Sequence, residues 1–305
     1  MRATNIYKPN NKFYFLFKEK EVQQMKRISS KKALLIFYGF DIILVLVILL
    51  LFLPLSRKNI PETSKMRFIS NAKEISSVEI YNAKERKKII ISQKDNIWLG
   101  TDDDSNMTLN WPGDIQTIKN FLAEAEKENT LYKKAEKVSS WASLGVDEKN
   151  SCRITFFKGT EKVSEFFFGI EDPISERISF RTSKEQTVWE AKTFVSNFLF
   201  KDASFWADAY IEPLCVTDEN ETSAKLRRGQ FIYLSPSENI KPEKVVLKIF
   251  SNTNKAVYSI YKKDDSYIVI PSFSSLEKNA DAIKSINYRY SISQWTYEKF
   301  LEASK

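Results

Sequence analysis

The sequence predicts an α+β protein, in which a single N-terminal transmembrane helix is followed by a strand-rich, antiparallel extracytoplasmic region. Three observations lead to this prediction. The first is an apolar run at residues 33–55 that contains one charged side chain, Asp41. The second is a series of short segments after residue 72 in which apolar and polar residues alternate, as in half-buried strands. The third is a small number of stretches with helical periodicity among these segments.

The apolar run is long enough to cross a bilayer, because a helix needs roughly 20 apolar residues to span the hydrocarbon core. Residues 1–32 carry nine Lys or Arg against two Glu, so the positive-inside rule places the N-terminus in the cytoplasm. A cleaved signal peptide would have a shorter apolar region that ends in small residues. The run instead ends with Pro54 and is followed closely by Arg57, which favours an uncleaved signal anchor in the bacterial cytoplasmic membrane.

The predicted organisation has five parts. They are a basic cytoplasmic tail at 1–32, the transmembrane helix at 33–55, a polar linker at 56–71, an extracytoplasmic α+β module at 72–215, and a shorter related module at 216–305. Met25 opens a compact basic segment directly before the apolar run, so translation starting at Met25 is an alternative to the longer tail.

Asp41 lies in the cytoplasmic half of the predicted span. A carboxyl group at the bilayer centre costs about 2.5 to 3.5 kcal/mol on insertion scales, and intramembrane acids usually face a partner or a polar cavity. Asp41 is therefore a candidate contact to another membrane protein. The alternative is an acid that the long apolar run tolerates, either protonated or directed towards the interface.

The composition excludes several classes of function. The chain has 47 Lys and Arg against 39 Asp and Glu, but residues 56–305 hold 38 against 36, so the extracytoplasmic part lacks the basic excess of a nucleic-acid-binding domain. There is no histidine, and the seven glycines form no phosphate-binding cluster. We therefore predict no catalytic residue, no cofactor and no metal. Cys152 and Cys215 could form a disulfide or remain as two buried thiols.

The extracytoplasmic part is predicted to consist of hairpins and amphipathic helices. Alternating residues predict a meander of strands over 78–99 and two hairpins, one over 152–168 and one over 178–190. Helical spacing predicts helices at Pro112 to Asn129 and at Thr193 to Phe205.

Part of the meander recurs later in the chain. Residues 78–99 align without gaps on residues 247–268, and each copy is followed by helical periodicity, in the second case near 280–287 and 297–301. The alignment pairs Ile80 with Ile249, Tyr81 with Phe250, Ile91 with Ile260, Asp95 with Asp264, and Trp98 with Tyr267. Two related modules would explain this similarity, although alternating strands also resemble one another by composition alone.

Three other patterns have a structural and a functional interpretation. Asp102, Asp104 and Asn106 have the spacing of a calcium loop, but the glycine and the final bidentate glutamate are missing, which favours a solvated turn. The neighbouring acids Glu171 and Asp172 could act in acid–base catalysis only within a pocket. Four tryptophans fall within apolar patterns and are expected in the core: Trp98, Trp141, Trp189 and Trp206.

The order of these features resembles that of the bacterial domain-of-unknown-function 4340 family. The matching stretches are VEIYN and IIISQKDNIW, the helix after WPGD, WASLGV at 141–146, FFFGIE, and the ISFRT and TVWEAK hairpin; they cover about residues 66–215. The sequence departs from the family pattern at Ser143 and Leu144, which precede Gly145. The resemblance implies a membrane-anchored extracytoplasmic protein encoded beside ABC transporters similar to the gliding-motility type, and it supplies no catalytic residue.

Two functions follow as expectations. The first is a non-enzymatic accessory or binding subunit of an ABC-transporter-type membrane assembly, whose partner is a membrane protein such as an ABC permease. The second is a cell-envelope protein that works alone, either a hydrolase with paired carboxylates or a wall-binding scaffold. A glycosidase would need two carboxyl groups about 5 to 9.5 Å apart in a cleft.

Overall fold

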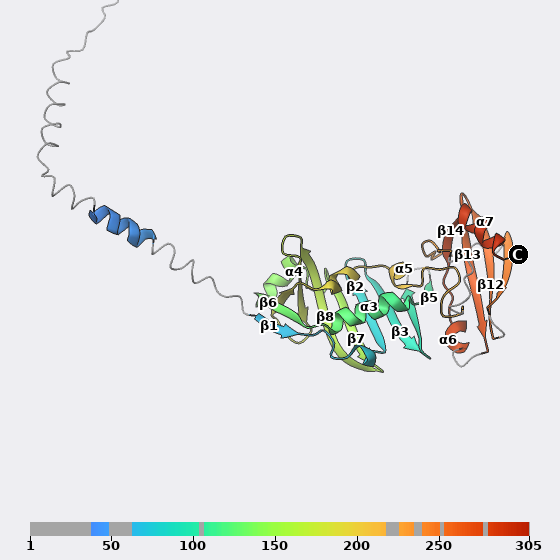
Figure 1. Ribbon diagram of the computed structural model, residues 1–305, viewed down its shortest axis with the longest axis horizontal. Coiled ribbons are helices and arrows are strands. Elements are labelled where there is room, and N and C mark those ends of the chain that lie inside the picture. The colour runs from blue at the N-terminus through green and yellow to red at the C-terminus, as the bar shows by residue number, and fades with distance from the viewer. Residues whose placement is uncertain are drawn as a thin grey trace, which may run out of the picture. The chain divides into compact units, whose positions relative to one another are not determined.

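The computed structural model describes residues 38–48, 63–103, 107–217, 226–234, 240–250, 253–276 and 280–304 (Figure 1). The chain divides into two compact units, Met1–Ile60 and Pro61–Lys305. In the first unit residues 38–48 are helical and Asp41 is exposed. Among the described residues no helix has both the length and the apolar character needed to cross a membrane. The rest of the predicted span, the tail at 1–32 with Met25, and residues 56–62 lie outside the described residues.

The second unit contains a ten-stranded sheet in which every pair of neighbouring strands is antiparallel. The strand order is β1-β6-β10-β9-β8-β7-β2-β3-β4-β5. The strands are β1 (Thr63–Met66), β2 (Ser77–Asn82), β3 (Lys87–Lys94), β4 (Ile97–Asp103), β5 (Thr108–Pro112), β6 (Asn129–Ala135), β7 (Cys152–Lys158), β8 (Glu161–Asp172), β9 (Arg177–Thr182) and β10 (Val188–Ala191). The predicted meander and both predicted hairpins are present.

A four-stranded antiparallel sheet follows, in the order β11-β12-β13-β14. Its strands are β11 (Lys244–Ile249), β12 (Asn254–Lys263), β13 (Ser266–Ser275) and β14 (Tyr290–Ser293). The α-helices of this unit are α3 (Ile115–Glu126), α4 (Trp141–Leu144), α5 (Ala203–Trp206), α6 (Ala280–Lys284) and α7 (Gln294–Glu302), and the 3₁₀ turns are η1 (Ala72–Glu74), η2 (Val138–Ser140) and η3 (Phe194–Phe198). The described part of this unit is therefore a strand-rich antiparallel α+β fold.

Helix α3 lies within the range that the sequence predicts. Asp114 caps its N-terminus, because the carboxylate accepts a hydrogen bond from the Gln116 N–H. The apolar face is buried, and Phe121 stacks on Phe156 of β7 at a centroid distance of 5.7 Å. At the C-terminal end the Ala125 carbonyl oxygen accepts hydrogen bonds from the N–H groups of Phe68 and Ile69.

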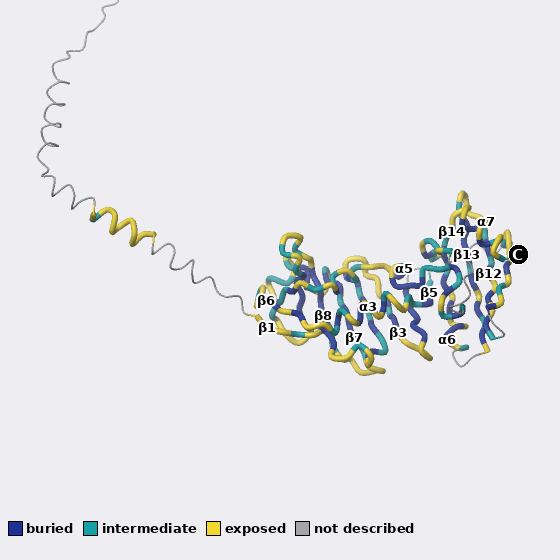
Figure 2. The backbone as a smooth tube through the Cα atoms, in the orientation of Figure 1, coloured by how far each residue is buried: buried dark blue, intermediate teal, exposed yellow. Residues whose placement is uncertain are grey.

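The core includes a segment that the sequence predicts as linker. Phe68 and Ile69 are each 2% exposed, and β1 pairs with β6 immediately before them. The Phe68 ring lies edge-on against three phenylalanines of the large sheet: Phe166, Phe168 and Phe180. Figure 2 shows buried stretches, in dark blue, along the strands of this sheet. The linker prediction rested on polar residues, and a four-residue edge strand with three exposed positions is almost as polar as a linker.

The opposite face of the large sheet buries one arginine. Arg181 is 3% exposed, and its guanidinium lies 3.8 Å from the Trp141 ring centroid and 3.7 Å from that of Phe167. Its Nε donates to the Val146 carbonyl oxygen at 2.8 Å. Burial lowers the pKa of Arg181 from its ordinary value. These contacts hold the WASLGV segment at 141–146 on the sheet. Helix α4 within this segment is capped by Gly145, whose φ of 68° is the left-handed conformation of a helix C-terminus.

The two segments that align in sequence belong to similar series of elements, although α6 interrupts the second series between β13 and β14. Both β2-β3-β4-β5 and β11-β12-β13-β14 are four-stranded antiparallel meanders, and a helix follows each of them, α3 or α7. The second hairpin has the same register in both, since Lys94 pairs with Ile97 and Lys263 pairs with Ser266. Both turns also begin with an aspartate in the left-handed region, Asp95 and Asp264.

The first hairpin differs between the two meanders. Ile80 pairs with Ile89 and is buried, whereas Ile249 pairs with Lys255 and is 70% exposed. Relative to the gapless alignment, β11 is shifted along its neighbour by three residues. An odd shift turns every side chain of a strand to the other face. The aligned pairs Ile80 with Ile249 and Tyr81 with Phe250 therefore do not occupy equivalent positions.

The described residues 203–217 and 226–234 connect the two sheets through one arginine and one phenylalanine. The Arg228 guanidinium donates to the carbonyl oxygens of Ser204, Ala207 and Asp208, and it lies 4.5 Å from the Phe231 ring centroid. Phe231 also contacts Trp111 of β5 and forms an isolated bridge with Tyr290 of β14. These contacts join both sheets within the compact unit Pro61–Lys305.

Candidate functional site

Two cavities lie together where β8 ends, β9 begins and η3 follows β10. One has a volume of about 300 Å³ and the other about 240 Å³, and both are lined by Glu171 and Ser196. We call their combined lining the η3 hollow. Its other lining residues are Lys84, Gly169, Ile170, Glu176, Ile178, Lys192, Thr193, Phe194, Asn197, Leu199 and Phe200.

A break in a predicted helix forms one wall of the hollow. The sequence predicts one helix over 193–205, but the structure has η3 and α5, separated by an irregular stretch. Phe200 has a φ of 55°, which no α-helix accommodates. Thr193 and Asp202 each cap a separate short element. The prediction of a continuous helix is therefore wrong, because local side-chain hydrogen bonds start two new turns.

The opposite wall comes from an irregularity in β8. The pairing of β8 with β9 shifts register between Phe168 and Glu171, which leaves Gly169 and Ile170 between two regular stretches. A Cβ at Gly169 would lie 2.0 Å from the Leu144 carbonyl oxygen, so this close backbone approach requires glycine. The bulge directs Ile170 outward, where it is 58% exposed.

The hollow has two exposed apolar side chains in its lining. Ile170 is 58% exposed and Phe194 of η3 is 64% exposed. Two large apolar side chains at one concave place differ from the scattered single apolar residues found on most protein surfaces. The arrangement is suited to receiving apolar side chains of another molecule.

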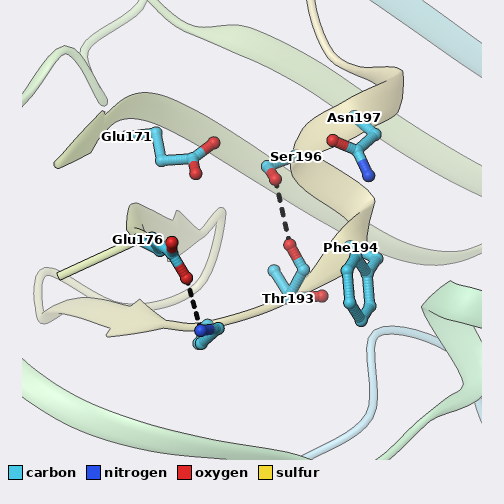
Figure 3. Close-up of a pocket in the computed structure, with 7 residues that line it drawn as sticks. Glu171, Glu176, Thr193, Phe194, Ser196 and Asn197 are labelled. Carbon is cyan, nitrogen blue, oxygen red and sulfur yellow. Dashed lines mark hydrogen bonds and ion pairs between the residues drawn. The ribbon is translucent and has the colours of Figure 1, made fainter. Parts of the chain in front are cut away.

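The charged groups of the hollow are mostly neutralised by neighbours. Glu176 forms an ion pair with Lys192, and this contact lowers the pKa of Glu176 (Figure 3). Asp172 accepts hydrogen bonds from the Ile174 N–H at 2.9 Å and from the Ser175 hydroxyl at 3.0 Å, and the Ile174 N–H, the largest cause, lowers the pKa of Asp172. Figure 3 shows Glu171 at the β8 side and Ser196 and Asn197 on η3.

The structure separates the acids that the sequence analysis paired. Glu171 lines the hollow, while the Asp172 carboxylate closes the β8–β9 turn. The second carboxylate of the hollow is instead Glu176. A general acid needs a raised pKa, and the ion pair with Lys192 shifts the pKa of Glu176 in the opposite direction.

The calcium-loop pattern does not come together as a site among the described residues. Asp102 is buried on β4 and accepts a hydrogen bond from the Tyr233 hydroxyl. Asp104 and Asn106 lie outside the described residues. The cavity beside Asp102 and Tyr233 has a volume of about 20 Å³, enough for about one water molecule. Within the described part of the chain no group of three metal-ligating side chains occurs.

The two cysteines are not bonded to each other. Cys152 is buried on β7, and burial raises the pKa of its thiol to about 11. Cys215 is partly exposed as a residue, but burial of its sulfur raises the thiol pKa to about 12. Of the alternatives left open by the sequence, the structure has two free thiols.

The tryptophans follow the core prediction to different degrees. Trp98 and Trp206 are buried, and Trp189 packs against the core from a half-buried position. Trp141 covers Arg181 and donates its indole N–H to the Gln186 carbonyl oxygen at 3.0 Å.

Comparisons with known proteins give no relative. No protein-family model, no curated protein and no solved structure matches the chain.

Proposed function

We propose that the chain is a non-enzymatic, membrane-anchored accessory subunit whose extracytoplasmic part binds a partner protein through the η3 hollow. The observation that supports this most directly is the pair of exposed apolar side chains in the η3 hollow, Phe194 in the cavity of about 300 Å³ and Ile170 in the cavity of about 240 Å³. Shallow, partly apolar depressions of this kind receive single anchoring side chains at protein interfaces.

Membrane anchoring in this proposal rests on the sequence of residues 33–55 and on the basic tail before them. An anchored protein with the N-terminus in the cytoplasm would meet the external loops of membrane proteins in the same bilayer. The partner we propose is an ABC-type permease, with Asp41 as its contact inside the membrane. The resemblance to the domain-of-unknown-function 4340 family points to the same kind of partner and remains part of the proposal.

We further infer that the two meanders derive from one duplicated module. The support is the succession of four antiparallel strands in each, interrupted by α6 only in the second, the identical register of β3-β4 and β12-β13, and the aspartate with positive φ in each turn. The three-residue shift of β11 would be a later change within the second copy. The module boundaries near residue 216 belong to this proposal.

A hydrolase is the second candidate, because Glu171 and Glu176 line the same hollow. Purified protein would then release soluble fragments from cell-wall material, and Glu171→Gln or Glu176→Gln would abolish the release. We expect no release from any of the three proteins, since Glu176 is held in its ionised form by Lys192. A wall-binding scaffold would instead sediment with the wall through residues 61–305 alone.

The test of the accessory function is a pull-down of the full chain from its own membranes in mild detergent, followed by mass spectrometry. We expect permease and ATPase subunits of one transporter, and we expect their loss when residues 33–55 are deleted. Phe194→Ser combined with Ile170→Ser should reduce recovery at least tenfold, a loss of about 1.4 kcal/mol or more. Leu276→Ser is the control, because Leu276 is also an exposed apolar residue but lies directly after β13 of the other sheet. Unchanged recovery with the double variant would exclude the hollow as the binding site.

A further inference from the structure

The edge of the four-stranded sheet is open at β11. Among the described residues β12 is the only strand that pairs with β11, whereas at the other edge β14 is covered by hydrogen bonds from Gly229 and to Gln230. In the large sheet the corresponding strand β2 is paired on both sides, by β3 and by β7. The second meander therefore lacks the strand that covers this edge in the first.

The hydrogen-bond phase of β11 determines which residues face the open edge. The Phe250 N–H donates to the Asn254 carbonyl oxygen at 2.9 Å, so residues in phase with Phe250, including Val246 and Lys248, bond to β12. The N–H and C=O groups of Val245, Leu247 and Ile249 point to the other side of the strand, away from β12.

The same three residues carry exposed apolar side chains. Val245 is 54% exposed, Leu247 57% and Ile249 70%, and Val257 of β12 lies directly beside Leu247. The inner face of this sheet is covered by α7, through Phe300 against Tyr258. The outer face thus presents an apolar row along an edge strand.

This edge lacks the usual protection against pairing. Natural sheets place lysine side chains or prolines on exposed edges to prevent other strands from adding to them. Lys248 is directed to the inner side, where its Nζ contacts a Glu212 carboxylate oxygen at 3.3 Å and donates to the Ala303 carbonyl oxygen at 2.8 Å. The side chains left on the outer face are the three apolar ones.

We propose that β11 pairs antiparallel with β11 of a second copy of this chain, so that the two small sheets form one continuous sheet across a two-fold axis. In this pairing Leu247 lies opposite Leu247 of the second copy, and Val245 lies opposite Ile249. All the outward-facing backbone groups of these three residues are then paired, and the apolar rows lie on one face.

The strand sequence KVVLKI favours this register over its neighbours. With Leu247 opposite itself, Lys248 faces Val246 and Lys244 faces Phe250, so no two lysines are opposed. Moving the register by one pair in either direction places Lys248 opposite Lys244 or opposite Lys248. Like charges directly opposite each other destabilise a sheet. A two-fold pairing in this register therefore brings the apolar rows of two copies together without opposing two lysines.

Cysteine cross-linking of the full chain in detergent tests both the pairing and its register. Leu247→Cys should give a disulfide-linked dimer upon mild oxidation. The two Leu247 residues face each other as a hydrogen-bonded antiparallel pair, whose Cα atoms lie about 5.5 Å apart, within the range of a disulfide. Ser272→Cys is the matched control on the same outer face, two strands from the axis, and should remain monomeric. The native thiols of Cys152 and Cys215 do not interfere because they are buried.

Two copies that carry different tags then test the register. When Val245→Cys with one tag is mixed with Ile249→Cys with the other, dimers that contain both tags should form at least tenfold more than dimers that contain one tag only. Leu247→Glu should convert the dimer to a monomer in light scattering, while Ser272→Glu should leave the dimer unchanged. A monomeric wild-type chain, a cross-link within one tag only, or an equal yield from Ser272→Cys would each overturn the proposal.

Discussion

The positions of single side chains in the large sheet depend on contacts between strands, and these contacts cannot be read from the local sequence. The aromatic and glycine positions can be read from the chain, but their mutual arrangement depends on strand pairing. Gly100 on β4 is an example, since it lies opposite Trp111 of β5 and leaves room for the buried indole. Nothing in the local sequence indicates that this glycine and this tryptophan share one space.

Gly100→Ala should strongly destabilise the protein. An added Cβ would lie 1.9 Å from the Trp111 ring, so the indole must leave its buried position, at a cost of about 3 kcal/mol or more. Urea unfolding followed by tryptophan fluorescence measures this change. Gly159→Ala is the control, since its Cβ would meet no atom within 4 Å and only the positive φ is unfavourable, which costs about 1 kcal/mol. Equal losses in the two variants would contradict the packing role of Gly100.

The two thiols should make the protein less stable in alkaline solution. Burial raises the pKa of Cys152 from 9.0 to about 11 and that of Cys215 to about 12, so both stay neutral in the folded state after the unfolded chain has begun to ionise. The contribution of the neutral, buried thiols to the free energy of unfolding is complete below about pH 9. It is lost as the pH rises through the folded-state pKa values of the two thiols.

Above about pH 9 the free energy of unfolding should therefore fall by up to about 1.4 kcal/mol per pH unit for each thiol. Urea titrations at successive alkaline pH values measure the slope, and Cys152→Ala should make it shallower. Buried Tyr258 and Tyr288, whose pKa values are also raised, contribute in the same direction at higher pH. A stability that stays constant from about pH 9 to about pH 11 would contradict the burial of these thiols.

At the scale of elements, the sequence predicts the strands and turns better than it predicts which strands pair with one another in the sheet. The β3–β4 and β7–β8 hairpins follow from alternation and from polar turns, which are local signals. The pairing of β1 with β6, and of β6 with β10, joins residues far apart in the chain and has no local signal. The predicted helix at 193–205 failed because its apolar spacing was helical, while Thr193, Phe200 and Asp202 imposed separate turns.

The η3 hollow was missed for the same reason. In a continuous amphipathic helix over 193–205 Phe194 would belong to the apolar side, whereas the short 3₁₀ turn leaves it at the surface. Thr193 and Asp202, two capping residues nine positions apart, were the available signal for two short turns. Glu171 was identified from the sequence, but its neighbour in the hollow is Glu176 rather than Asp172.

Asn96→Gly should stabilise the β3–β4 hairpin. Asp95 and Asn96 both have positive φ, at 50° and 67°, as in a type I′ turn, where glycine is favoured at the second position. We expect a gain of about 0.5 to 1 kcal/mol in the free energy of unfolding. Asn96→Val should lose about 1 to 2 kcal/mol, since a β-branched residue is strained at positive φ. Thermal unfolding of both variants beside the wild type measures the two opposite shifts, and a loss with glycine would contradict the turn geometry.

For the whole molecule, the described residues from 63 onward behave as one packed body with two sheets. Composition and alternation predicted a strand-rich antiparallel protein, but they did not predict that one irregular segment would hold the sheets together. Phe231 contacts Trp111 of the large sheet and Tyr288 beside the small one. Residues 203–234 contain no long stretch of helical or alternating pattern, so nothing in their sequence indicates this role.

Phe231→Ala should destabilise both sheets together. Removing a buried phenylalanine costs about 3 to 5 kcal/mol, and here the loss falls on a contact that the sheets share. Fluorescence of the tryptophans in the large sheet and hydrogen exchange of β12 amides should report the same midpoint shift. Phe273→Ala, in the small sheet alone, tests the coupling further, because one cooperative unit should show the same shift in both probes. Separate transitions would mean that the sheets unfold independently.

The strand order of the large sheet has a consequence during synthesis of the chain. Strands β2 to β5 are neighbours in both sequence and space, so they can pair as soon as residue 112 has emerged. The free edge of β2 must then wait for β7, whose last residue is Lys158, and β1 must wait for β6. For the time needed to make about 45 residues, a few seconds at ordinary translation rates, the nascent meander exposes the edge that the finished protein hides. A chaperone that binds strand edges would therefore act on this chain in one defined interval of its elongation.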